Sequence, residues 1–190
     1  MGALDPALVV EARDAAAWRA WLEQHHATST GVWALRARAG ADRDLVAYLD
    51  LVKQALCFGW IDGTVKPNDE QTLGQWMTPR KPGSGWAATN KARIIELEAS
   101  GEMTDAGRRV IAQAQADGSW ELLDGPEAGI EPAELTAALD SVPAARAHWD
   151  GFPMSARKLG LTMIAMAKKP ETKASRIAKI VALAAEGKRP

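Results

Sequence analysis

Apolar residues in the first 80 positions follow two different spacings in turn, which predicts alternating strands and helices. Four segments have the alternation or the short apolar run that is typical of strands: residues 7–12, 31–39, 60–66 and 71–78. Apolar positions three and four apart predict one helix after Asp14, which is a good N-cap, and a second from Leu49 to Phe58. The expected order is therefore strand, helix, strand, helix, strand, strand.

Beyond Pro82 the spacing becomes helical. The expected helices begin near Trp86, Thr104, Pro132, Pro143, Ser155 and Pro170. Residues 119–131 are expected to be an irregular acidic link. The pattern thus predicts an α+β fold, with a small antiparallel or mixed sheet and flanking helices in the N-terminal part and an all-helical C-terminal part. We expect the first part to span residues 1–118 and the second residues 126–190, packed together as a single globular unit.

Charge is unevenly distributed, although the chain of 190 residues has a net charge of only −1. Residues 100–150 contain ten acidic and three basic side chains, whereas residues 151–190 contain nine basic and two acidic ones. One interpretation is that the two segments pack together and neutralise each other. The other is a basic surface for nucleic acid or an acidic membrane, on the helix that carries Lys173, Arg176 and Lys179. A pI near 6.3 argues against nucleic-acid binding.

Several classes of protein have no support in the sequence. No apolar run approaches the roughly 20 residues that span a bilayer, and the N-terminus lacks the pattern of a secretory signal, so a cytoplasmic location is expected. A lone cysteine, Cys57, fits a reducing compartment and is expected to be a buried inert thiol.

No metal is expected, because His25 and His26 diverge on a helix and no metal-binding spacing occurs. No cofactor motif occurs either.

The stretch from Cys57 to Asn90 is the best candidate for a ligand site, because it holds three Trp among turn-forming Gly and Pro residues. Arg80 and Lys81 precede a predicted helix start, where backbone N–H groups also favour an anion. An aromatic and basic pocket is therefore predicted from seven residues: Trp60, Asp62, Trp76, Arg80, Lys81, Trp86 and Asn90. The alternative is a structural loop in which Arg80 pairs with an acid such as Asp62.

Three motifs carry a family resemblance: CFGWIDG at 57–63, TPRKPGSGW at 78–86 with Asn90, and KKPETKASRIAKIV at 168–181. Together they resemble the YdeI/OmpD-associated family, also described as bacteriocin-protection proteins, over the span from Trp18 to about Gly187. The resemblance implies a small bacterial cytoplasmic α+β protein linked to envelope stress or bacteriocin tolerance. It implies no particular reaction.

Three functions remain open at this point. The favoured one is a non-enzymatic module that holds a small anionic ligand or an acidic segment of a protein partner in the predicted pocket. The second is an enzyme in the same pocket, with Asp62 as the acid or base and Arg80 stabilising charge. The third is nucleic-acid binding through the C-terminal helix. The sequence leaves the oligomeric state open.

Overall fold

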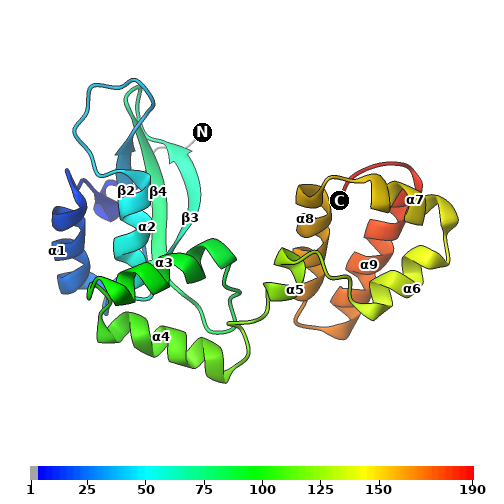
Figure 1. Ribbon diagram of the computed structural model, residues 1–190. Coiled ribbons are helices and arrows are strands. Elements are labelled where there is room, and N and C mark those ends of the chain that lie inside the picture. Colours follow the sequence, from blue (N-terminus) through cyan, green and yellow to red (C-terminus); the bar gives the residue numbers. More distant parts are fainter. Residues whose placement is uncertain (1–3) are drawn as a thin grey trace. The chain divides into compact units, whose positions relative to one another are not determined.

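The computed structural model describes residues 4–190 (Figure 1). Contacts divide the chain into two compact units. The sheet unit contains the chain up to Pro82 together with Thr89–Ala116, and the helical unit contains Gly83–Ala88 and Asp117–Pro190. The predicted α+β class is confirmed, since the sheet unit holds a four-stranded mixed sheet and the helical unit holds helices α5 to α9. The predicted boundaries had placed residues 83–88 with the sheet.

The sheet unit follows the predicted order of strands and helices. Its elements are β1 (Val9–Val10), α1 (Ala15–His25), β2 (Val32–Ala37), α2 (Tyr48–Cys57), β3 (Trp60–Pro67), β4 (Thr72–Pro79), α3 (Ala88–Ala99) and α4 (Asp105–Ala116). The strands lie in the order β1-β2-β4-β3, with β1 parallel to β2 and the other pairs antiparallel. The strand order thus makes β3 an edge strand.

Two predicted helix boundaries coincide with the observed ones for the expected physical reason. The Asp14 carboxylate accepts a hydrogen bond of 2.7 Å from the backbone N–H of Ala17, which satisfies a free donor in the first turn of α1. Gly59 ends α2 with φ at +74°, where a side chain is strained. A Cβ on Gly59 would lie 2.5 Å from Cγ2 of Val110, so this glycine also lets α4 approach the end of α2.

The alternation in residues 31–39 predicts a half-buried strand, but the observed burial along β2 is different. The first four residues of β2, Val32 to Leu35, are all buried, so both faces of the sheet are covered there. Trp33 and Leu35 pack with Leu4 and with half-buried Leu8 and Leu45. The N-terminal segment covers the face that carries Trp33 and Leu35, and Val32 and Ala34 are buried on the other face, so alternation fails as a guide to burial here.

A bulge in β3 changes the face of the sheet on which Val65 lies. Asp62 pairs with Met77 and Val65 pairs with Gln75, so three steps along β3 match two along β4. The extra residue places Val65 on the same face as Asp62. Strict alternation along residues 60–66 predicts that Asp62 and Val65 lie on opposite faces.

Three helix predictions need correction. The helix expected from Trp86 begins at Ala88, and Ser155 lies within α8 (Met154–Ala165) rather than before it. In α2, helical spacing predicts Leu49 as a core residue, but Leu49 is 46% exposed and Leu51 is fully buried instead. Residues 119–131 are not an irregular link, because they contain α5 (Asp124–Glu127) with Pro126 buried. The predicted spacing of α2 is confirmed, but the prediction of which side of this helix faces the core was wrong.

The helical unit packs its helices around one apolar core. Its elements after α5 are α6 (Ala133–Asp140), α7 (Pro143–Gly151), α8 and α9 (Pro170–Ala185). The largest core side chain is Trp149, which is fully buried among the leucines and isoleucines of α6, α8 and α9. The spacing of apolar residues in the last helix predicts a face with Ile177, Ile180 and Ala184, and these three are buried in α9. None of the helices described in residues 4–190 has both the length and the apolar character of a membrane span.

Candidate functional site

The structure brings together some of the seven predicted pocket residues and separates others. Trp60 and Arg80 line one hollow of the sheet unit, which we call the basic hollow. Asp62 lines a different hollow of the same unit, which we call the tyrosine hollow because Tyr48 also lines it. Lys81 is exposed and lines neither of the two. The remaining three, Trp76, Trp86 and Asn90, lie in other surroundings.

The basic hollow has a volume of about 380 Å³. It is lined by the end of α1, the turn after α2, the junction of β3 and β4, and one face of α4. The lining residues are His26, Ala27, Phe58, Gly59, Trp60, Pro79, Arg80, Ala106, Arg109, Val110 and Gln113. The four residues from α4 are spaced three and four apart, so a single helix face forms that wall.

Arg80 is held in this hollow by its backbone. Its N–H donates to the Gly59 carbonyl at 3.0 Å, directly after β4 ends. The side chain is 8% exposed, and burial lowers its pKa to about 10, with the charge of Asp62 acting in the opposite direction. Arg80 therefore remains protonated at neutral pH. Arg109, in contrast, is exposed on α4.

His26 and Trp60 have fixed orientations beside these arginines. Nδ1 of His26 lies 2.8 Å from the Leu22 carbonyl, which can only accept, so Nδ1 carries the hydrogen. Nε1 of Trp60 donates to the His26 carbonyl at 3.2 Å, and the indole packs edge-on against Trp21. Trp60 therefore uses its own donor within the protein and offers the hollow an apolar wall.

Asp62 lies on β3 in the tyrosine hollow, where its Oδ2 accepts a hydrogen bond of 2.8 Å from the Tyr48 hydroxyl. Asn90, on α3, accepts a bond of 2.8 Å from Nη1 of Arg93. The charge of Arg93 acts on Tyr48 and lowers its pKa against larger effects that raise it. Asn90 itself lines neither of the two hollows.

Trp76 lies on the opposite face of the sheet from Asp62, because it neighbours Met77, the strand partner of Asp62. Its ring packs against Trp33 with 5.0 Å between ring centres. A side chain on Gly31 would collide with this ring, so Gly31 leaves room for it. The contacts of Trp76 are those of a sheet-packing residue.

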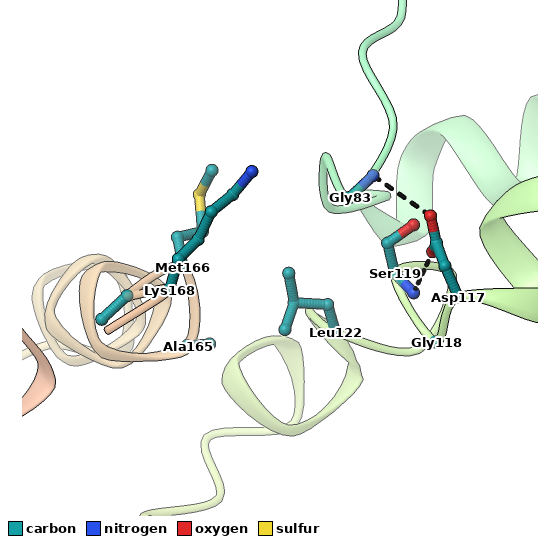
Figure 2. Close-up of a pocket in the computed structure, with 9 residues that line it drawn as sticks. Gly83, Asp117, Gly118, Ser119, Leu122, Ala165, Met166 and Lys168 are labelled. Atoms are coloured by element: carbon teal, nitrogen blue, oxygen red, sulfur yellow. Dashed lines mark hydrogen bonds between the residues drawn. The ribbon is translucent and has the colours of Figure 1, made fainter. Parts of the chain in front are cut away.

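Trp86 belongs to the helical unit, together with residues 83–85 of the loop that follows Arg80 and Lys81. Trp86 is buried and packs against Trp120 with 5.0 Å between ring centres. Figure 2 shows Asp117 reaching the loop, where its carboxylate accepts hydrogen bonds from the backbone N–H groups of Gly83, at 3.2 Å, and Ser119, at 2.9 Å. These contacts fix residues 83–86 to the helical unit, beside a hollow that Lys168 also lines.

The basic face of α9 is largely engaged within the protein. Lys173 forms an ion pair of 2.6 Å with Glu134, and Nη1 of Arg176 donates to the Met163 carbonyl. Lys158 of α8 pairs with Glu127. The ion pairs Lys173–Glu134 and Lys158–Glu127 therefore join the basic segment to the acidic one within the helical unit. This contact agrees with the first interpretation of the charge pattern.

Several residues of these hollows were absent from the predicted site: Arg36, Tyr48, Arg109 and His26. Alternation along residues 31–39 predicts that Arg36 faces solvent, and Arg109 belongs to no motif. Their positions depend on which elements meet in space, which local spacing does not give. Cys57 is buried, and burial raises the pKa of its thiol, as expected for an inert cysteine. Residues 4–190 contain no group of three or more His, Cys, Asp or Glu arranged to hold a metal ion.

Comparison with known families gives two matches. Residues 10–110 match a family described as a domain of unknown function, DUF8412. Residues 129–187 match the family described as "Bacteriocin-protection, YdeI or OmpD-Associated" (OmdA), which confirms the resemblance over that span. The motifs at 57–63 and 78–86 lie in the other match, so the confirmed resemblance covers less of the chain than predicted. No curated protein and no solved structure matches the chain.

Proposed function

We propose that this chain, which belongs to the DUF8412 domain family, binds a small anionic ligand in the basic hollow of its sheet unit. One observation carries the proposal: every ionisable side chain that lines this hollow is basic. These side chains are Arg80, Arg109 and His26. A cavity with cations and no lining carboxylate favours an anion, because nothing within it opposes the ligand's charge.

The geometry suits a carboxylate or a phosphate. A guanidinium presents N–H donors in a planar fork that matches two oxygens of either group. Arg80 lies at the buried end, where low dielectric strengthens its attraction for an anion, and exposed Arg109 can meet the ligand from α4. Phe58 and Trp60 supply an apolar wall for the rest of the ligand. A volume of about 380 Å³ lies in the range of small-molecule sites.

A binding role is favoured over the enzyme alternative. That alternative needs Asp62 and Arg80 to act on one substrate, yet the two side chains line different hollows. The OmdA match at residues 129–187 supports a wider role in bacteriocin protection. We further propose that the protein is bacterial and acts in the cytoplasm. In this proposal anion binding is the biochemical activity through which such a role acts.

Thermal unfolding of the full chain with a panel of anions tests the proposal. The panel contains inorganic phosphate, ATP, glucose 6-phosphate, citrate and a short oligonucleotide. A ligand at 100 times its dissociation constant adds about 2.7 kcal/mol of stability, which raises the unfolding midpoint by a few degrees. We expect at least one anion to raise the midpoint of the wild type and of Arg13→Ala, whose side chain is 80% exposed and lies outside the hollow.

The variant that matters is Arg109→Ala. Since Arg109 is exposed, its removal leaves the core intact, and the ligand-induced shift should fall sharply while the unliganded midpoint changes little. An equal shift in Arg109→Ala and Arg13→Ala contradicts the proposal. So does a wild type that responds to no anion.

A further inference from the structure

The tyrosine hollow is a separate cavity with different chemistry. It has a volume of about 400 Å³ and is lined by Arg36, Tyr48, Asp62, Gly63, Val65 and Gln75. It shares no lining residue with the basic hollow. Its side chains come from β2, β3, β4 and the first residue of α2, so several elements of the sheet unit fix their positions.

The bulge in β3 shapes this hollow. It places Asp62 and Val65 on one face of the strand, with Gly63 between them. Gln75 is 1% exposed, and its Nε2 donates to the Gly63 carbonyl at 2.9 Å, which holds the bulged backbone in place. The position of the Asp62 carboxylate is therefore built into the sheet.

Arg36 is the unusual residue of this hollow. Its guanidinium carbon lies 5.7 Å from the centre of the Tyr48 ring, an attractive cation–π distance. Its Nε is buried, and within the described residues 4–190 this atom has no hydrogen-bond acceptor and the side chain forms no ion pair. Buried guanidinium donors ordinarily meet a carboxylate, a carbonyl or a water molecule. A half-buried cation without a carboxylate partner, at the edge of a cavity, indicates a place for an anion.

Asp62 adds an acceptor to the same cavity. Its Oδ2 is occupied by the Tyr48 hydroxyl, whereas its Oδ1 accepts no hydrogen bond from residues 4–190. Burial and the hydrogen bond to Asp62 raise the pKa of Tyr48, so the phenol stays protonated and keeps donating to Oδ2 at neutral pH. The carboxylate is thus oriented, with one oxygen left for a donor from a ligand.

We propose that the tyrosine hollow binds a small carboxylate that carries a neighbouring hydroxyl or ammonium group. Arg36 pairs with the ligand's carboxylate, and Oδ1 of Asp62 accepts a hydrogen bond from the hydroxyl or ammonium group. The negative charge of Asp62 disfavours a simple carboxylate, because such a ligand brings a second negative charge and no donor. This inference is independent of the basic hollow and its proposed anion.

Calorimetric titration of the full chain with three matched compounds tests it. Lactate and alanine carry a hydroxyl and an ammonium group where propionate carries only hydrogen, so the three share one carbon skeleton. We expect lactate or alanine to bind at least tenfold more tightly than propionate, and the better of the two identifies the preferred donor. Equal binding of all three, or binding of none, overturns the proposal.

Two variants test the assigned roles. Arg36→Gln should abolish binding of the preferred compound. Arg38→Gln is the matched control, two residues after Arg36 in the sequence, and should leave binding unchanged. Asp62→Asn should remove the tenfold preference over propionate, and this isosteric change gives a result even if Arg36→Gln fails to fold. Unchanged affinity in Arg36→Gln, or an unchanged preference in Asp62→Asn, also overturns the proposal. Arg109→Ala should bind the preferred compound normally, which separates this site from the basic hollow.

Discussion

In the helical unit Arg146 lies between the carboxylates of Glu131 and Asp150, whereas in the sheet unit Arg36 faces the ring of Tyr48 and forms no ion pair within the described residues. Glu131 also accepts a hydrogen bond of 2.8 Å from Nε1 of Trp149, so the pair is tied to the core. The comparison separates two uses of arginine. Arg146 pairs with carboxylates of the fold and so stabilises it. Arg36 keeps guanidinium donors at a cavity, where a ligand can bind them.

The largest expected effect follows from breaking the structural pair. Arg146→Gln leaves Glu131, whose side chain is only 17% exposed, without its principal partner, and should lower the free energy of unfolding by about 3 kcal/mol. Denaturant unfolding of the full chain measures this. Arg108→Gln is the matched control, since Arg108 pairs with Glu98 at the surface, where solvent screens the pair and a clearly smaller loss is expected. Equal losses in the two variants would show that the buried pair has no special weight.

An intermediate effect concerns pH. The hydrogen bond from Arg146 lowers the pKa of Glu131, so this carboxylate contributes stability that is fully present above its unfolded pKa of about 4.3 and is lost as pH falls through the lower folded value. At pH 6, Glu131→Gln should be about 2 kcal/mol less stable than the wild type. The difference should shrink as the pH is lowered from 4 to 2. A difference that stays constant over this range would contradict the assigned ion pair.

The smallest effect is expected for Arg36→Gln. The change removes a cation–π contact but no ion pair, so the unfolding free energy should change by less than about 1 kcal/mol. Denaturant unfolding without added carboxylates tests this. A loss as large as that of Arg146→Gln would make Arg36 a structural residue and remove the contrast between the two units.

The sequence predicts the order of strands and helices in the sheet unit because that order depends on local signals. The Asp14 cap and the stop at Gly59 are such signals, and both act within a few residues. The bulge at Asp62 is different, since it depends on how β3 pairs with β4. One extra residue there changes the face of Val65, which no count along a single strand reveals.

The candidate site was predictable only in part for the same reason. Trp60 and Arg80 belong to one hollow, but Arg109 reaches it from α4, and helical spacing does not show which neighbour a helix face meets. The contact of Asp117 with Gly83 likewise joins positions 34 residues apart in the chain. Such long-range contacts decide which basic residues support the structure and which line a cavity.

The bulge in β3 also bears on how readily this edge of the sheet can pair with a strand of another molecule. Because β3 is last in the strand order, its outer edge could act as a template for a strand of another molecule. The irregular register at Asp62 to Val65 interrupts the regular spacing of backbone donors and acceptors that an added strand needs. Pro67 removes one further donor at the end of the strand. The irregularity that orients Asp62 therefore also limits aggregation through this edge.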